Sequence, residues 1–241
     1  MTIRGVLFDK DGTLISFERT WGPAFAAVIV ALAKGDPLKL AAQAEALEFS
    51  LAEQSFLPTS PIIAGSTGHY GALWAAALGR SDHGELKREI DALTAVESLR
   101  SLTAIGEPVL VVLELKRLGL SVGVGTNDSE ASARRQLAAL GLLEEMDFIA
   151  GYDSGHGSKP GPGMIHAYAD ELGVDMGHIA MVGDTLHDME AAHAAGAVAI
   201  AVLSGPATRE QLEARADHVI EDISGLPALL AGLVEDREAT G

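Results

Sequence analysis

Two carboxylates stand one residue apart, directly after a short apolar run near the start of the chain. Asp9 and Asp11 follow residues 3–8, whose composition is that of a buried strand. If the strand continues, successive side chains point to opposite faces, so Asp9 and Asp11 would share a side while Lys10 points away. Two like charges this close are unfavourable unless a cation or a proton lies between them, so divalent metal binding and acid–base catalysis are the most plausible roles of the pair. An ordinary solvated Asp-Gly turn is the alternative.

A hydroxyl and an amide follow a second apolar alternation. Residues 120–124 alternate between apolar and small side chains, and Thr126 and Asn127 come next, ahead of a predicted helix from residue 129. A hydroxyl and free backbone N–H groups at such a turn suit an oxyanion such as phosphate. The same residue types cap helices in many proteins, so this stretch alone leaves both roles open.

A lysine framed by glycine and proline stands out, because the chain has 17 Lys and Arg against 34 Asp and Glu. Lys159 lies within the Gly- and Pro-rich residues 157–163. Pro160 suits the first turn of a helix, which the pattern extends to about residue 172, so Lys159 would lie at its mouth. A solvated loop lysine is the alternative.

A third apolar run, residues 179–182, ends in Gly183 and Asp184, and Asp188 follows four residues later. If a helix starts near residue 185, Asp184 lies at or near its N-cap and Asp188 one turn further on, and both can face the strand ends. The alternative is an Asp cap followed by a surface Asp.

Taken together and in this order, these stretches resemble the haloacid-dehalogenase-type phosphohydrolase superfamily. The resemblance runs from residue 3 to about residue 196, and the matched residues are Asp9 to Thr13 for the first motif, Thr126 for the second, Lys159 for the third, and Gly183, Asp184 and Asp188 for the fourth. Two residues depart from the family pattern: Lys10 occupies a position that is often apolar in the family, and His187 lies inside the fourth motif. Neither removes a matched functional group, but both stand where they could affect substrate or metal affinity.

The resemblance implies a magnesium-dependent phosphatase that acts through an aspartyl-phosphate. Asp9 would be the nucleophile, and Asp11 would protonate the leaving alkoxide and then deprotonate the attacking water. Mg²⁺ would be held by the Asp9 carboxylate, the backbone carbonyl of Asp11 and Asp184. Asp188 would support the metal, either through a metal-bound water or by pairing with Lys159.

The phosphate group would be held by Thr126 and the N–H of Asn127, while Lys159 neutralises both Asp9 and the transferring group. A sugar phosphomutase of the same superfamily is the main alternative, and a receiver-like phosphoacceptor domain is another. A haloacid dehalogenase is disfavoured, because those enzymes lack the second Asp and the magnesium ligands. Phosphoglycolate-type phosphatases are the closest general resemblance by position and size of the helical insertion.

From about residue 107 the chain alternates helical and apolar strand patterns. This order predicts an α/β fold with a doubly wound, mostly parallel Rossmann-like sheet flanked by helices, which residues 3–8 would join. The expected strands are 120–126, 147–150, 178–182, 197–203 and 217–220, and the expected helices end at 118 or span 129–140, 162–172, 185–195 and 223–233.

Residues 16–105 have a different character, which predicts an all-helical cap domain inserted into a catalytic core of residues 1–15 and 106–241. The expected helices lie near 20–34, 36–56, 68–79 and 84–101, with no strand between them. Residues 58–69 break the helical pattern and are a candidate substrate-facing loop. His69 and Arg19 are candidate specificity residues there, with a surface or capping role as the alternative.

The composition is that of a water-soluble enzyme with a substantial core, at 241 residues and 48% hydrophobic content. The longest apolar stretch, residues 24–33, is too short to span a membrane, and we expect no signal peptide before the first strand. The absence of cysteine fits a reducing compartment, so we expect a cytoplasmic protein. A net charge of −17 argues against nucleic acid and anionic membranes as partners and leaves a small-molecule phosphate ester. We expect a monomer or a homodimer.

Overall fold

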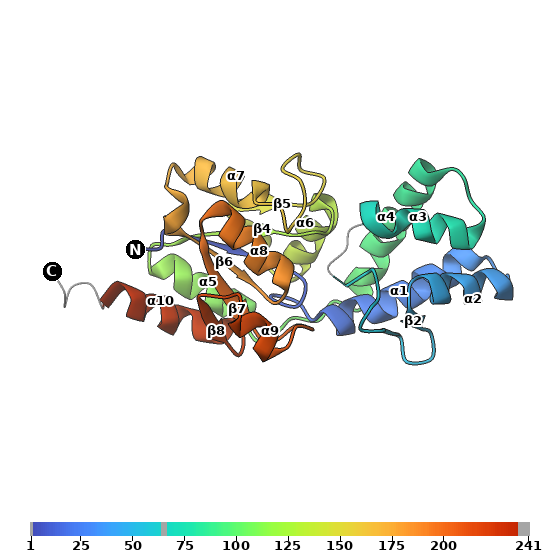
Figure 1. Cartoon of the computed structure of the whole chain (residues 1–241), viewed down its shortest axis with the longest axis horizontal. Coiled ribbons are helices and arrows are strands. Elements are labelled where there is room, and N and C mark those ends of the chain that lie inside the picture. The colour runs from blue at the N-terminus through green and yellow to red at the C-terminus, as the bar shows by residue number, and fades with distance from the viewer. Residues whose placement is uncertain (1, 64–66, 236–241) are drawn as a thin grey trace. The chain divides into compact units, whose positions relative to one another are not determined.

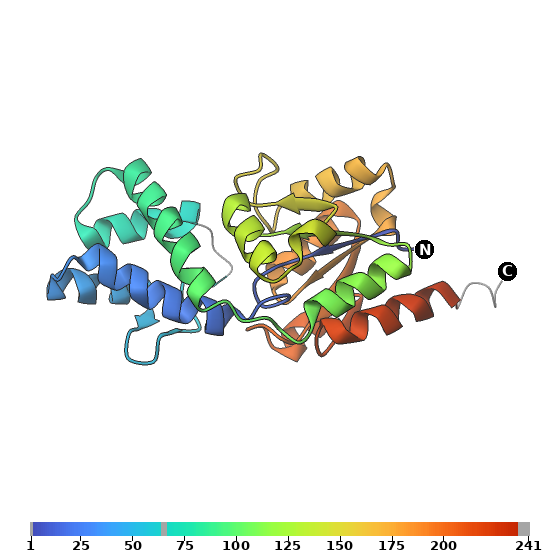
Figure 2. The same cartoon turned by 180° about the vertical axis from the view of Figure 1, so that it is seen from behind.

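The computed structural model describes residues 2–63 and 67–235, and the chain divides into two compact units. Residues 1–16 and 104–241 form one, which we call the sheet unit, and residues 17–103 form the other, the inserted unit (Figures 1 and 2).

A parallel sheet forms the centre of the sheet unit. Within the described residues it has six strands in the order β5-β4-β1-β6-β7-β8. The strands are β1 Gly5–Phe8, β4 Ser121–Gly125, β5 Phe148–Ala150, β6 Ile179–Gly183, β7 Val198–Val202 and β8 His218–Ile220. In the register, Phe8 at the end of β1 pairs with Val124 on one side and Val182 on the other. The carboxyl ends of three adjacent central strands therefore meet at one edge.

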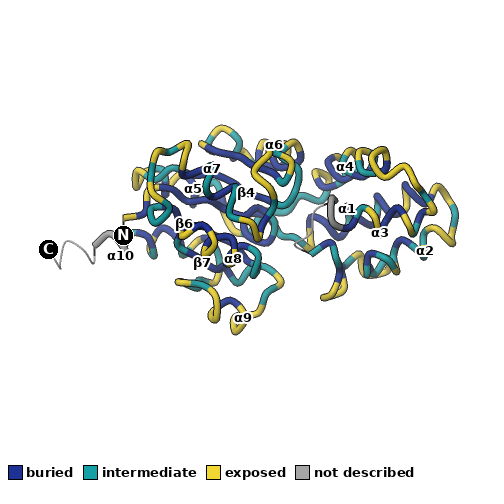
Figure 3. Tube along the Cα trace, turned by 45° about the horizontal axis from the view of Figure 1, so that its top comes forward, coloured by how far each residue is buried: buried dark blue, intermediate teal, exposed yellow. Residues whose placement is uncertain are grey.

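Helices cover both faces of this sheet, which confirms the predicted doubly wound α/β fold (Figures 1 and 2). Helices α5 Pro108–Arg117, α6 Glu130–Ala139 and α10 Leu226–Glu235 pack on one face, and α7 Gly163–Leu172 and α8 Leu186–Ala195 pack on the other. Along β1, Val6 and Phe8 belong to the first apolar cluster and Leu7 to the second. Both faces of the strands are thus buried, as the dark blue strands in Figure 3 show, and this explains their continuous apolar sequences.

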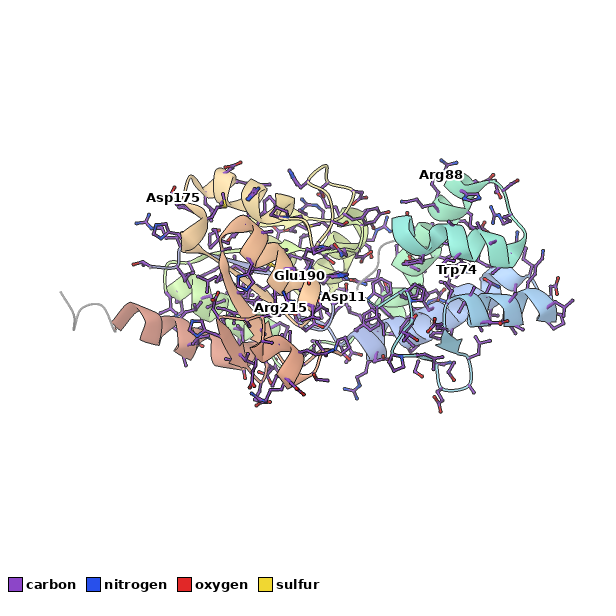
Figure 4. The ribbon with its side chains drawn as sticks, viewed as in Figure 1. Asp11, Trp74, Arg88, Asp175, Glu190 and Arg215 are labelled. Atoms are coloured by element: carbon purple, nitrogen blue, oxygen red, sulfur yellow. The ribbon has the colours of Figure 1, made fainter. Side chains whose placement is uncertain are left out.

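The inserted unit has its own apolar core between four helices. These are α1 Phe17–Ala33, α2 Pro37–Ala46, α3 Thr67–Leu78 and α4 His83–Arg100. Trp74 lies among these helices (Figure 4), is fully buried, and has its ring 5.6 Å from that of Phe25. Its indole N–H donates to the side chain of Gln43 at 2.7 Å, so the polar atom of this large side chain is satisfied inside the core.

The expectation of an all-helical insertion is wrong in one segment. The predicted helix over residues 36–56 ends at Ala46, and an antiparallel pair of two-residue strands follows, β2 Phe49–Ser50 and β3 Ser55–Phe56. The backbone enters the left-handed region at Glu48 (φ 50°), which no helix continues through. Phe49 then pairs with Phe56, and burial of the two rings holds this short hairpin.

Short segments elsewhere also differ from the prediction. Helix α9, Arg209–Glu213, lies between β7 and β8 where no helix was expected. Helix α7 starts at Gly163, so Pro160 lies in the preceding loop and not in the first helical turn. In the part of the chain that the structure describes, no helix is both long enough and apolar enough to cross a membrane.

Candidate active site

Asp9 is the first residue after β1 and is almost completely buried. Its backbone N–H donates to the carbonyl of Val182 at 2.7 Å, which ties the start of the loop to β6. The chain then turns tightly, with the N–H of Leu14 donating to the carbonyl of Lys10 at 2.9 Å. Gly12 has φ 89° in this turn, a conformation that favours glycine. The turn places Thr13 so that its hydroxyl donates to Asp184 Oδ1 at 3.1 Å.

Lys159 joins two of the predicted carboxylates. Its Nζ lies 2.5 Å from Asp9 Oδ1 and 2.6 Å from Asp188 Oδ1, and all three side chains are at most 8% exposed. The three residues come from distant parts of the sequence, and the sheet edge brings them together. The alternative of a solvated loop lysine is therefore wrong.

The Asn127 side chain fixes the backbone of Lys159. Asn127 Oδ1 accepts from the N–H of Lys159 at 2.8 Å, and Asn127 Nδ2 donates to the Lys159 carbonyl at 3.0 Å. This pair of hydrogen bonds connects the loop after β4 with the loop before α7. The sequence suggested only the backbone N–H of Asn127, since nothing in the pattern indicates a side-chain contact across 32 residues.

Asp188 is buried in the first turn of α8. Its Oδ1 binds Lys159, and its Oδ2 accepts from the N–H and the hydroxyl of Thr185 at 3.0 and 2.6 Å. The N-cap of α8 is Thr185, and Asp184 precedes it by one residue. Asp184 therefore lies near the cap, as one form of the expectation had it, but not at the cap. A Cβ at position 183 would overlap the Asp188 carboxylate, so this close approach requires Gly183.

Asp184 has one carboxylate oxygen without a hydrogen-bond partner. The residue is 1% exposed, its Oδ1 accepts from Thr13, and its Oδ2 is buried and unpartnered. A Cβ at either Gly12 or Gly205 would overlap this carboxylate. The Ser204 hydroxyl donates to the carbonyl of Gly12 at 2.7 Å and holds the two loops together.

The sequence analysis missed Ser204 and Gly205, although a signal was present. They follow directly after the apolar run 197–203, which was predicted as a strand of the same sheet. Carboxyl ends of neighbouring parallel strands meet at one edge, so the residues after this strand were candidates by the same rule as the others.

A divalent cation fits this group of carboxylates. Asp9, Asp184 and Asp188 each offer a carboxylate oxygen, and these oxygens lie within 4.8 Å of one another. The buried, unpartnered Asp184 Oδ2 is an atom that a cation would satisfy, and the donor set consists of oxygens only, as Mg²⁺ prefers. The residues present therefore suit a magnesium ion.

The electrostatics of the site lead to the same conclusion. Burial raises the pKa of Asp9 to about 7, with Asp188 and Asp11 adding to the effect and Lys159 opposing it. Burial, followed by the charges of Asp9 and Asp188, raises the pKa of Asp184 well above its ordinary value. Burial alone would lower the pKa of Lys159, but its two carboxylate partners outweigh that and raise it. Without a further cation, Asp9 and Asp184 hold their protons unusually strongly.

Asp11 lies at the same edge of the sheet (Figure 4) and pairs with its neighbour Lys10. Lys10 is fully buried, and its Nζ lies 2.7 Å from Asp11 Oδ2 and 3.1 Å from Asp128 Oδ2. The expectation that Lys10 points away from the carboxylates is wrong. Strand β1 ends at Phe8, so the alternation of side chains does not extend to these residues.

Thr126 follows β4, the strand next to β1, and is 1% exposed. Its N–H donates to the carbonyl of Ala150 at 2.9 Å, and its hydroxyl accepts from the N–H of Asp128 at 3.1 Å. A hydroxyl that accepts one hydrogen bond keeps its own O–H as a donor, so Thr126 can still bind an anion.

Three further candidates from the sequence are His187, Arg19 and His69. His187 is partly exposed on α8, with a buried Nδ1 that has no hydrogen-bond partner. Arg19 is exposed on α1. The side chain of His69 and the end of the predicted loop 58–69 lie outside the described residues.

Comparison with known proteins identifies the family. The family model of haloacid dehalogenase-like hydrolases matches residues 3–196. The chain belongs to this family. The matched residues include every carboxylate of the site together with Lys159.

Two relatives and one solved structure illustrate the similarity. The chain is 41% identical over 108 residues to a probable phosphatase, IndB, of Dickeya dadantii, an alignment that covers 45% of this chain and 47% of the relative. It is 28% identical to the phosphoglycolate phosphatase of Rhodospirillum rubrum, across 86% of this chain and 82% of that protein. The crystal structure of a predicted phosphoglycolate phosphatase from Haemophilus somnus shares the fold, with a TM-score of 0.73 at 18% identity over 95% of this chain and 98% of the other. The chain thus matches less than half the length of the first of these relatives and most of the second.

Proposed function

We propose that the protein is a magnesium-dependent phosphatase that hydrolyses a small-molecule phosphate monoester through an aspartyl-phosphate on Asp9. The observation that carries this proposal is the Lys159 ammonium between Asp9 and Asp188, beside the unpartnered Oδ2 of Asp184. Phosphoryl transfer to a carboxylate requires a nucleophile and positive charge beside it. Here a buried carboxylate lies next to a fixed cation and to a group of oxygens that suits a metal.

In the first step, a carboxylate oxygen of Asp9 attacks phosphorus, and the bond between phosphorus and the ester oxygen breaks. Asp11 gives its proton to the departing alkoxide, which leaves as an alcohol. In the second step, the Asp11 carboxylate takes a proton from water as the water oxygen attacks phosphorus. The bond between phosphorus and Asp9 breaks, which releases phosphate and returns both side chains to their starting states.

The other residues bind and orient the phosphate. Lys159 offsets negative charge on Asp9 and on the transferring group, and Asn127 holds Lys159 in place through its backbone. The Thr126 hydroxyl and the N–H of Asn127 donate to phosphate oxygens. Mg²⁺ held by Asp9, Asp184 and the backbone carbonyl of Asp11, with Asp188 in support, would supply positive charge that stabilises the transition state.

One sequence relative supports a candidate substrate. A relative that aligns over 82% of its own length is a phosphoglycolate phosphatase. We therefore propose 2-phosphoglycolate as the first candidate substrate, with the inserted unit as the part that selects among phosphate esters.

The test is phosphate release from a panel of phosphorylated small molecules that includes 2-phosphoglycolate and p-nitrophenyl phosphate. We expect turnover with Mg²⁺, silence in excess EDTA, and recovery when Mg²⁺ is added back. Asp9→Asn is nearly isosteric and should reduce phosphate release by at least about 10⁴-fold, since the nucleophile is lost while the fold is kept.

Two results would contradict the proposal. Full activity in excess chelator would exclude the metal, and an Asp9→Asn enzyme that keeps several per cent of activity would exclude the nucleophile. Conversion of a sugar phosphate into its isomer without net phosphate release would instead indicate a mutase.

A further inference from the structure

We propose that Lys10 is a positioning residue for Asp11, whose carboxylate it holds in the orientation needed for proton transfer. The proposal rests on the function proposed above, in which Asp11 is the general acid and base. It concerns Lys10, the residue within the first motif whose type departs from the family pattern and to which the proposed function gives no role.

Three side-chain oxygens surround the Lys10 ammonium. Its Nζ lies 2.7 Å from Asp11 Oδ2 and 3.1 Å from Asp128 Oδ2, and it donates to Gln136 Oε1. An ammonium carries three N–H donors, so the number of facing oxygens matches its capacity. Burial of an ammonium is costly unless it is paired, and the Lys10 side chain is 0% exposed. The cluster is therefore a buried ion network centred on Lys10, in which Asp128 Oδ2 is paired by charge but has no hydrogen-bond partner.

The three partners come from three different places in the fold: the turn after β1, the loop after β4, and α6. Asp11 belongs to the turn after β1, whereas Asp128 follows β4, two residues after the phosphate-binding candidate Thr126. Gln136 lies on α6 and is itself buried. The ammonium thus fixes the loop that carries both catalytic aspartates to the loop that carries Thr126.

Burial decides how Lys10 can act. Its side chain has no exposed surface, whereas the Asp11 side chain is 17% exposed. A ligand can therefore reach Asp11 but not the ammonium behind it. Because Lys10 engages Oδ2 of Asp11, we assign proton exchange with the leaving group and with water to Oδ1.

The test compares substrates that differ in their need for an acid. For Lys10→Met and Asp11→Asn, kcat/KM would be measured on the fastest alkyl phosphate of the panel and on p-nitrophenyl phosphate, whose leaving group needs little protonation. The ratio kcat/KM includes departure of the leaving group but not hydrolysis of the aspartyl-phosphate. On the alkyl phosphate, we expect kcat/KM to fall by about 100-fold or more in Asp11→Asn and by about tenfold or more in Lys10→Met. On the aryl phosphate, we expect kcat/KM of both variants to fall by less than about threefold.

A double variant separates positioning from general damage. In an Asp11→Asn background, Lys10→Met should cause little further loss, because the group that it positions is already gone. Lys116→Met is the matched control, since Lys116 also pairs with a carboxylate, at 3.4 Å from Asp147, but away from the site. This control should leave the ratio between the two substrates unchanged.

Removal of Lys10 also leaves Asp128 without its cation, which could prevent folding. The variant Lys10→Met/Asp128→Asn removes both charges and keeps the shape at position 128, and it should show the same selective loss on the alkyl phosphate. Thermal unfolding by circular dichroism would check that each variant is folded.

The possible failures are distinguishable. A wild-type enzyme that releases no phosphate, or an active Asp9→Asn variant, would overturn the proposed function and this inference with it. If those two behave as proposed, equal losses of Lys10→Met on both substrates, losses that add to those of Asp11→Asn, or no loss at all would each overturn the role of Lys10 alone.

Discussion

The buried carboxylates of the site are only partly neutralised by the protein itself. Asp9, Asp184 and Asp188 would carry three negative charges when ionised, and Lys159 supplies one positive charge in direct contact with two of them. Two unit charges about 4 Å apart interact by roughly 4 kcal/mol at an effective dielectric constant near 20. The two remaining negative charges match one divalent cation, which is a stronger reason to expect a metal than the presence of acidic residues alone.

Residue types and spacing predicted that Asp9, Lys159, Asp184 and Asp188 lie together at one sheet edge. Asp9, Lys159 and Asp188 are in direct contact, and Asp184 lies beside them, because each follows a strand end or opens a helix at one sheet edge. The contacts of Lys10 could not be predicted in the same way. They depend on where β1 ends. The strand ends at Phe8, so the expected alternation of side-chain directions does not apply to Asp9, Lys10 and Asp11.

The side chain of Asn127 provides a test at the residue scale. Asn127→Ala keeps the backbone N–H but removes both hydrogen bonds to Lys159. A lysine displaced from Asp9 would reduce kcat by about 10- to 100-fold, as a shift of about 1 Å in a catalytic group does elsewhere. The measurement is steady-state kinetics with Mg²⁺ at saturation.

Ser154→Ala is the matched control for this variant. It also removes two hydrogen bonds, one from the N–H of Gly151 at 2.9 Å and one to Glu130 at 2.6 Å, and neither involves a candidate catalytic residue. If both variants lose the same activity, the Asn127 side chain contributes stability only. If Asn127→Ala is fully active, only its backbone N–H matters, as the sequence alone suggested.

At the scale of elements, the sheet was easier to predict than the inserted unit. Buried parallel strands need continuous apolar sequence, and each observed strand lies within a residue or two of its predicted range. The strands β2 and β3 have only two residues each. Such short strands cannot show the alternation of apolar and polar residues by which a strand is recognised in a sequence. The predicted helix over 36–56 therefore extended ten residues past its true end at Ala46.

The loop after β7 provides a test at this scale. Gly205→Ala would place a methyl group against the carboxylate of Asp184 and displace it from the metal site. We expect the apparent Mg²⁺ affinity to fall by about 10- to 100-fold, which is typical when a group that orients a metal ligand is changed. The measurement is activity, or the midpoint of thermal unfolding, as a function of Mg²⁺ concentration.

Gly84→Ala is the control, because no heavy atom beyond its chain neighbours and the nearby backbone of its own helix lies within 4 Å of a Cβ built at that position. It should leave the Mg²⁺ dependence unchanged. A Gly205→Ala protein with the wild-type Mg²⁺ affinity would show that the Asp184 carboxylate does not bind the metal or that the loop yields freely.

At the scale of the whole molecule, the net charge of −17 and the buried carboxylates act in the same direction. Self-repulsion grows as the carboxyl groups ionise, and the site concentrates several of them in a region with little water. Stability should therefore depend on both pH and metal, and the two dependences should be linked through the same side chains.

The sign of this linkage follows from Asp9. Its pKa in the folded, metal-free protein is about 7, above its ordinary value of 3.8. A carboxyl group whose pKa is raised by folding contributes stability that is fully present below the unfolded-state pKa, and this contribution is lost as the pH rises through the folded-state pKa. The metal-free protein should thus lose this contribution between about pH 4 and pH 7, and the raised pKa of Asp184 adds a loss of the same sign.

Magnesium should reverse this loss, because it binds the ionised carboxylates and competes with their protons. We expect the increase in Tm caused by Mg²⁺, relative to EDTA, to be small near pH 5 and clearly larger near pH 8. The measurement is thermal unfolding followed by circular dichroism at several pH values, which needs no substrate. Asp184→Asn should show little increase at any pH, since it removes the charge of the unpartnered carboxylate. An increase of equal size at both pH values, or one that survives in Asp184→Asn, would show that Mg²⁺ stabilises the protein at some other place.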